Sequence, residues 1–124
     1  MAKISLLLDT DIFIDFFNTG RFHALFDSSS FTLYYSIVTK KELLTKLGLR
    51  ENEREAILDE LSRCRLITLS DSITARYSEL RRQHPSLDKG DALIAATALV
   101  KHLPLMTRNK RHFRMVTGLT LFGE

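Results

Sequence analysis

The sequence has little cysteine and little histidine. Cys64 is the one cysteine among 124 residues, which excludes an intramolecular disulfide framework and a zinc site built only from thiolates. The chain has four histidines, and His84, His102 and His112 do not have the spacing of metal ligands. A metal site in this chain would therefore have to draw its ligands from oxygen atoms.

Long hydrophobic runs are missing as well. No stretch of the sequence approaches the roughly 20 apolar residues that a membrane-spanning helix needs. The apolar run near the N-terminus is short and is followed at once by acids, so it does not resemble a secretory signal. We therefore expect a cytoplasmic protein that does not use a membrane as a partner.

Strong charge of one sign is also missing. The 18 lysines and arginines exceed the 15 acids by three, which gives a net charge of +3 and an isoelectric point near 9.2. A mildly basic surface is compatible with nucleic-acid binding but does not identify it. Without repeats, low-complexity segments or linkers, 124 residues suit a single domain (residues 1–124) that can bury one sizeable core.

Strand-like and helix-like segments alternate along the chain. Short apolar, β-branched and aromatic runs predict strands at residues 4–8, 31–35, 66–69 and 105–107, with a fifth edge strand at 119–122. Periodicity and capping residues predict helices after the first strand and at residues 21–26, 36–49, 51–65, 71–83 and 89–102, with a helical turn at 109–113. This alternation predicts an α/β sandwich with a mostly parallel sheet of four to five strands.

The first predicted strand runs directly into two acids. Residues 4–8 suit a strand that is buried on both faces, and Asp9 and Asp11 follow it. Apolar residues then recur at helical spacing, with Thr10 or Asp11 placed to cap the new helix. Ligands of open α/β sheets bind at the carboxyl edge of the strands, and both carboxylates are expected at that edge.

Two further acids, Glu42 and Asp91, lie near the predicted starts of later helices. Each has an ordinary structural explanation, because Thr39 and Glu42 have the spacing of a capping box, and so do Asp88 and Asp91. The helix that follows Asp91 is apolar nearly all round and is expected to be buried. A carboxylate at its start is costly unless a cation or hydrogen-bond donors compensate it.

Taken together, the four acids indicate a metal site. All of these strand-to-helix junctions lie at one edge of a parallel sheet, so Asp9, Asp11, Glu42 and Asp91 are expected to converge. Clustered carboxylates repel one another, and a divalent cation relieves that repulsion. Oxygen ligands without histidine or cysteine favour Mg²⁺ or Mn²⁺, and such an ion can support hydrolysis of a phosphodiester.

Basic residues crowd the segment that follows the fourth predicted strand: Arg108, Lys110, Arg111 and Arg114. Because this segment lies at the same edge of the sheet as the acids, Arg108, Lys110 and Arg111 are candidates for contacts with a nucleic-acid backbone. For His112, in the same segment, a role at the surface is the expectation.

Four blocks of the sequence, in order and spacing, resemble the PIN-domain ribonucleases, and most closely the toxins of VapBC-type toxin–antitoxin pairs. The resemblance covers nearly the whole chain. Its blocks are Leu8–Asp11, the segment 36–43 that contains Glu42, the segment 91–98 that begins with Asp91, and the segment 107–113 that runs from Thr107 to Phe113.

This resemblance implies a three-layer α/β/α sandwich that dimerises, through an exposed face of its early helices, and that cuts RNA with a metal-activated water. By position, Asp9, Glu42 and Asp91 match the three core acids, and Asp11 stands where the family often has Asn. Thr10 and Thr107 are expected in supporting roles. The resemblance also implies Mg²⁺ or Mn²⁺ as cofactor, RNA as substrate and a cognate antitoxin as partner.

One position departs from the family pattern. Many relatives carry an acid in the last block where this chain has Asn109. Asn109 can still offer a neutral oxygen to a metal or to water, so a second metal position is expected to be weaker. A catalytically weak PIN-like module that binds RNA or protein remains an alternative reading.

A phosphatase of the haloacid dehalogenase type is a second alternative, because an apolar strand followed by Asp9-Thr10-Asp11 also matches its nucleophile motif. That class needs a later lysine and a downstream pair of acids. Lys89 and Asp91 offer a partial match, but position 95 is alanine where the second acid is expected.

Overall fold

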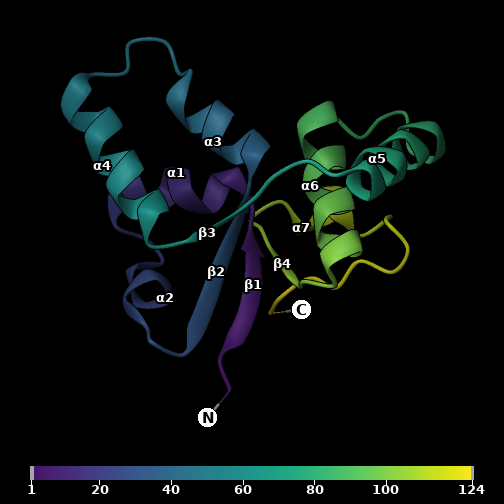
Figure 1. Cartoon of the computed structure of the whole chain (residues 1–124), viewed down its shortest axis with the longest axis horizontal. Coiled ribbons are helices and arrows are strands. Elements are labelled where there is room, and N and C mark those ends of the chain that lie inside the picture. The colour runs from purple at the N-terminus through teal and green to yellow at the C-terminus, as the bar shows by residue number, and fades with distance from the viewer. Residues whose placement is uncertain (1, 124) are drawn as a thin grey trace.

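The computed structural model describes residues 2–123 and shows one parallel sheet between two layers of helices (Figure 1). The sheet has the strand order β3-β2-β1-β4, and every pairing in it is parallel. The strands are β1 (Ile4–Leu8), β2 (Phe31–Ser36), β3 (Arg65–Ile67) and β4 (Leu105–Met106). All four carboxyl ends therefore lie at one edge.

Seven helices connect and cover these strands within residues 2–123. They are α1 (Thr10–Thr19), α2 (His23–Asp27), α3 (Ile37–Leu44), α4 (Glu51–Ser62), α5 (Asp71–Gln83), α6 (Lys89–Lys101) and α7 (Lys110–Phe113). The predicted alternation of strands and helices is confirmed, with shifts of a few residues at most boundaries. The largest shift is at α3, which was predicted to reach residue 49 but ends at Leu44.

The strand β1 separates two hydrophobic cores because successive side chains of a strand point to opposite faces. Leu7 belongs to a core formed with α5, α6 and Phe113 of α7. Leu6 and Leu8 belong to a second core, formed with residues of α1, α2, α3 and α4. The expected three-layer α/β/α sandwich is confirmed by this division of the helices between the two faces.

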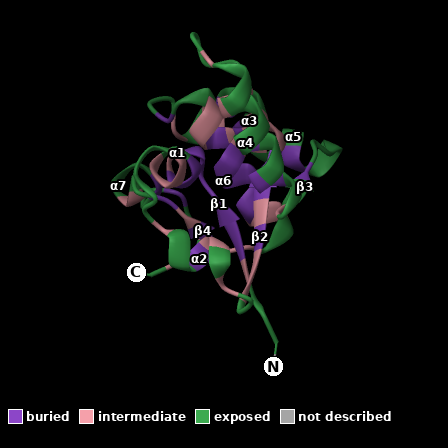
Figure 2. Ribbon diagram, turned by 90° about the vertical axis from the view of Figure 1, so that its left-hand side faces the viewer, coloured by how far each residue is buried: buried purple, intermediate pink, exposed green. Residues whose placement is uncertain are grey.

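The helix α6 is the most deeply buried helix of the fold, as Figure 2 illustrates with the purple ribbon of α6 beside β1. Small side chains allow its backbone to approach the sheet closely. Its buried residues are Ala92, Ile94, Ala95, Ala96, Thr97 and Ala98. The expectation of a buried helix after Asp91 is therefore confirmed.

Two boundary predictions are wrong. The cap of α1 is Asp9, not Thr10 or Asp11, because its carboxylate accepts from the amide of Thr10. The fifth strand predicted at residues 119–122 is a single parallel bridge between Leu105 and Leu121. The glycines on either side of it, at positions 118 and 123, have φ angles of 84° and 81°, which turn the chain out of an extended path.

Membrane-spanning character is missing from the helices. Within residues 2–123, none of them combines the length and the apolar composition that crossing a bilayer requires.

Candidate active site

The carboxyl edge of β1 and β4 brings together side chains that are far apart in the sequence. Asp9 directly follows β1, and Thr107 directly follows β4, its neighbour in the sheet. The Thr107 hydroxyl donates to Asp9 Oδ2 over 2.7 Å, which is a contact across 98 positions of the chain. The parallel sheet thus produces the predicted meeting of the first and last sequence blocks.

Asp9 is a buried acid with few compensating contacts. Its exposed fraction is 4%, and its two oxygens accept from the Thr10 amide and the Thr107 hydroxyl, each over 2.7 Å. Burial, followed by the neighbouring charge of Asp11, raises the pKa of Asp9 from 3.8 to about 7. The hydrogen bonds act in the opposite direction but do not offset the loss of water.

Asp11 lies beside Asp9 and has one oxygen without a partner. Its Oδ2 accepts from the Arg108 amide over 3.1 Å and lies 3.4 Å from the Thr107 hydroxyl oxygen, whose proton goes to the nearer Asp9. Its Oδ1 is buried and has no hydrogen-bond partner among residues 2–123. Burial raises the pKa of Asp11, as it does for Asp9. A buried carboxylate oxygen without a hydrogen-bond partner is a position where binding of a cation or a water molecule is most favourable.

Glu42 reaches the site from inside α3. Its Oε1 accepts from the Thr10 hydroxyl over 2.8 Å, and the hydroxyls of Thr10 and Thr39 are 2.9 Å apart. The capping box predicted for Thr39 and Glu42 is wrong, because Ser36 caps α3 by accepting from the Val38 amide. With the capping role excluded, the contact with Thr10 is what orients the Glu42 carboxylate.

Asp91 lies in the first turn of α6, where Asp88 serves as the cap. Burial, followed by the charge of Asp88, raises the pKa of Asp91 to about 6. The charges of Glu42 and Asp11 raise it further, and His112 lowers it. The charges of the other acids thus act on Asp91, whereas the convergence of all four acids on one metal ion stays a prediction.

His112 is a functional candidate that the sequence did not indicate. Its Nδ1 lies 3.9 Å from Asp91 Oδ2, whereas only a surface role was expected. The two residues line a hollow of about 390 Å³ together with Arg111 and Met115. The only signal in the sequence was the position of His112 inside the basic segment. Histidines are common at protein surfaces, so this position alone could not identify His112 as a site residue.

Asp15 is the other residue that the sequence did not indicate. Its Oδ1 accepts from Arg108 Nη1 over 2.7 Å, and its Oδ2 lies 3.5 Å from Arg21 Nη1. Asp15 is four positions after Asp11 on α1, so both point toward the segment that follows β4. The side chain of Arg108 is therefore paired with a carboxylate of the protein itself. The next residue, Asn109, which was a candidate metal ligand, is exposed.

The acids suit a hard divalent cation by their chemistry, but they do not form a closed cage. Within residues 2–123, no group of three or more His, Cys, Asp or Glu side chains is arranged so that it could hold a metal ion. Mg²⁺ does not require such a cage, because it keeps several waters and is commonly held by one or two carboxylates together with substrate phosphates. The buried oxygen of Asp11 that has no partner in the described chain is the observation that fits a nearby cation.

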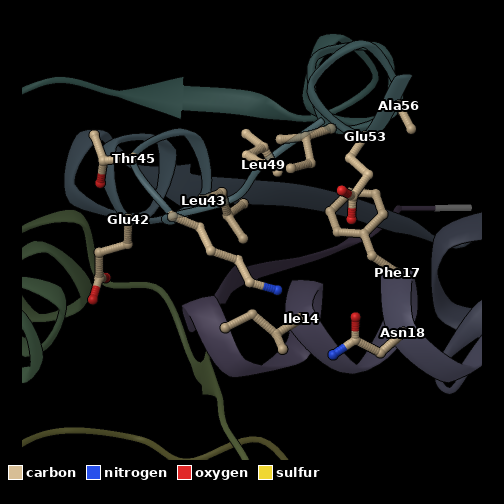
Figure 3. Close-up of a pocket in the computed structure, with 11 residues that line it drawn as sticks. Ile14, Phe17, Asn18, Glu42, Leu43, Thr45, Leu49, Glu53 and Ala56 are labelled. Carbon is tan, nitrogen blue, oxygen red and sulfur yellow. The ribbon is translucent and has the colours of Figure 1, made fainter. Parts of the chain in front are cut away.

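A separate groove of about 510 Å³ lies between α1, α3 and α4. Figure 3 shows Ile14 and Phe17 of α1 facing Leu43 and Leu49 across it, with Glu42 at one end. Glu42 thus belongs both to the groove and to the group of acids. The groove is mainly apolar where the acid site is polar.

Comparison with known families agrees with this geometry. The family model of the PIN domain matches residues 6–118. The chain belongs to the PIN domain family. Over 126 aligned positions it is 30% identical to Ribonuclease VapC1 of Methanocaldococcus jannaschii, and the alignment covers 96% of this chain and 88% of that protein.

Solved structures share the fold over nearly the whole chain. A toxin–antitoxin complex from Klebsiella pneumoniae matches with a TM-score of 0.75 and 31% identity, over 93% of this chain and 95% of that chain. VapBC2 from Rickettsia felis, bound to a DNA fragment from its promoter, matches with a TM-score of 0.81 over 95% of this chain and 97% of that chain. Its identity of 24% shows the fold alone.

Proposed function

We propose that this PIN-domain protein is a VapC-type toxin, an endoribonuclease that hydrolyses RNA phosphodiesters with Mg²⁺ or Mn²⁺. The observation that carries the proposal is the pair of acids after β1, of which Asp9 is buried and Asp11 is half-buried. Asp9 has a pKa raised to about 7, and the neighbouring Asp11 Oδ1 has no partner in the described chain. Removing two neighbouring carboxylates largely from water is costly, and a divalent cation offsets that cost.

In this proposal Asp9, Glu42 and Asp91 would hold the ion, one or two of them directly and the rest through its waters, with Asp11 assisting directly or through water. When bound, the ion supplies an activated water and neutralises charge on the phosphate. Asn109 offers a neutral amide in place of an acid, so the proposal requires only one ion. The matched relative from Methanocaldococcus jannaschii, VapC1, is named a ribonuclease, which supports RNA as the substrate.

Residues around the acids fix the carboxylates before substrate arrives. Thr107 donates to Asp9 and contacts Asp11, and Thr10 holds Glu42. The Arg108 amide donates to Asp11. Side chains held in this way lose little freedom when a ligand binds, which is the basis of preorganised sites. Lys110 and Arg111 remain the candidates for neutralising the RNA backbone.

The proposed partner is a cognate antitoxin, because the matched structures from Klebsiella pneumoniae and Rickettsia felis are toxin–antitoxin complexes. The groove between α1, α3 and α4 suits an apolar segment of such a partner (Figure 3). A segment seated there would pass Glu42, and a basic side chain on it could then neutralise the acids. The homodimer expected from the family remains a prediction that light scattering of the purified chain would test.

RNA cleavage by the purified chain tests the proposal. We expect cleavage with Mg²⁺ or Mn²⁺, none in EDTA, and none with Asp9→Asn. Asp71→Asn is a matched control, because Asp71 is an exposed acid at the start of α5. If Asp9→Asn and the wild type behave alike, the ribonuclease assignment is wrong.

The same experiment separates the alternatives. A binding module would retain RNA or the antitoxin without cutting, in every metal tested. A phosphatase would instead release phosphate from a small phosphomonoester, and that release would depend on Asp9 as a nucleophile. The phosphatase outcome is not expected, because Ala95 stands where the phosphatase motif needs its second acid.

A further inference from the structure

A second hollow, of about 460 Å³, opens beside the acids on the side of β4. Its lining includes three cationic and two aromatic side chains, and it shares Thr107 with the acid site: Arg21, Phe22, Thr107, Arg108, Lys110 and Phe122. We infer that this basic–aromatic hollow binds one nucleotide of a single-stranded RNA next to the phosphate that is cleaved. The inference rests on the proposed ribonuclease function and assigns the path of the substrate.

The charges of the hollow favour a polyanion. Asp15 forms ion pairs with both arginines of the hollow, a close one with Arg108 (2.7 Å) and a longer one with Arg21 (3.5 Å). Lys110 Nζ donates to the carbonyl oxygen of Gly123 over 3.3 Å. This partner is neutral, and no carboxylate within residues 2–123 forms an ion pair with Lys110. Lys110 and Arg21 are therefore the cations that can contact phosphate, whereas Arg108 is held in the wall of the hollow.

The aromatic side chains supply flat surfaces for a base. The guanidinium carbon of Arg21 lies 4.8 Å from the centroid of the Phe22 ring, so cation and ring form one stacked unit. Phe22 also has a φ angle of 68°, which is unusual for a bulky residue. Bases of single strands stack on aromatic rings and on guanidinium planes, and a basic wall follows their backbone.

The position of the hollow defines a path for the RNA strand across the acid site. Thr107 lines the hollow and donates to Asp9, so a nucleotide there adjoins the acids. Arg111 and His112 of α7 line a different hollow, the one that contains Asp91. A strand that crosses α7 would therefore meet cations before and after the acids. The groove between α1, α3 and α4 is mainly apolar and suits a protein segment instead.

Binding of a fluorescein-labelled single-stranded RNA, followed by anisotropy in EDTA, tests the inference with the full chain. We expect Lys110→Gln to weaken binding about threefold to tenfold and to reduce the slope of log affinity against log salt by about 0.7, the value for one phosphate contact on a single strand. Phe22→Leu keeps an apolar side chain and should weaken binding about fivefold or more through lost stacking, with the salt slope unchanged.

Lys101→Gln is the matched control, since it removes the same charge from the exposed C-terminal end of α6. It should bind RNA as the wild type does. Arg21→Gln gives a further check, because Arg21 is exposed and its replacement should not disturb folding. If Lys110→Gln and Arg21→Gln both match the control, the inference is overturned. It is also overturned if they retain RNA but lose the antitoxin.

The binding experiment is independent of cleavage. If the wild type cuts RNA while Lys110→Gln and Arg21→Gln bind RNA normally, only the proposed path of the RNA is contradicted. A chain that cuts no RNA while those variants lose binding would contradict only the ribonuclease assignment.

Discussion

The two halves of the acid site are built differently. Asp9 and Asp11 form the inner half, in which buried Asp9 and half-buried Asp11 are held by Thr107 and by the Arg108 amide. Glu42 and Asp91 form the outer half. There, Glu42 has one hydroxyl donor from Thr10, and Asp91 lies 3.9 Å from an exposed histidine.

This difference separates what each half can contribute. The inner half is fixed before any ligand binds, and its burial opposes the charged state that a metal needs. The outer half is less buried and can adjust to a substrate. We therefore expect changes in the inner half to alter stability, metal affinity and pH dependence together, and changes in the outer half to alter mainly activity.

The largest expected effect comes from neutralising one acid in each half. Asp9→Asn and Asp91→Asn should each lower RNA cleavage by more than the roughly 10–100-fold that is typical for losing an outer-shell partner of a metal. Asp9→Asn should also raise the free energy of unfolding at pH 8, by about 1–3 kcal/mol, because a neutral amide is less costly to bury. Asp91→Asn should raise it less, because burial raises the pKa of Asp91 less than that of Asp9. Denaturant titration of both variants measures this. Equal stability changes in the two variants would show that the halves do not differ in this way.

The hydroxyl donors offer the next comparison. Thr107→Val and Thr10→Val keep the side-chain shape and remove the donors to Asp9 and Glu42. Thr107→Val should reduce Mn²⁺ affinity by about 10–100-fold, since it leaves buried Asp9 with a single donor. Thr10→Val should reduce it less, because Glu42 is less buried. Calorimetry of Mn²⁺ binding decides the order, and a larger loss for Thr10→Val would reverse the roles of the halves.

The pH dependence of stability should follow the inner half. The native pKa of Asp9 is about 7, against 3.8 in the unfolded chain. Between these values the unfolded chain releases a proton that the native state keeps, so the free energy of unfolding should fall as pH rises from about 4 to about 7. Asp91, with a pKa of about 6, contributes in the same direction. Bound Mn²⁺ favours the ionised acids and should oppose the fall.

Thermal unfolding at pH 5 and pH 8, with and without Mn²⁺, measures this dependence. Asp9→Asn should flatten the curve without metal. A curve that stays as steep in this variant would show that Asp9 is not its source.

The smallest expected effect is at His112, whose side chain is 61% exposed. Removing its influence with His112→Gln should raise the pKa of Asp91, because His112 lowers it in the wild type. The acid limb of the cleavage profile should shift slightly to higher pH, with a loss of only a few-fold at neutral pH. An unchanged profile would mean that His112 has no effect on Asp91.

Much of the fold was predictable because its signals are local. The strands at residues 4–8 and 31–35 and the buried helix after Asp91 follow from apolar patterning. Boundaries were less predictable where tertiary contacts decide them. Residues 119–122 have strand-like composition, but in the structure Leu121 forms only a bridge with Leu105.

The sequence by itself determined the identity of the acids and the edge of the sheet on which they lie. A strand followed by Asp9, and a buried helix that begins near Asp91, place both carboxylates at the same edge in any parallel sheet. The positively charged segment after the fourth strand was equally visible.

Only the tertiary structure decided how those side chains are held. The pairing of Thr107 with Asp9, of Thr10 with Glu42 and of Arg108 with Asp15 joins positions that are 98, 32 and 93 residues apart. Such contacts depend on side-chain directions at the edge of the packed sheet, and no local pattern encodes them. Burial had the same origin, because it is the packing around Asp9 that raises its pKa to about 7.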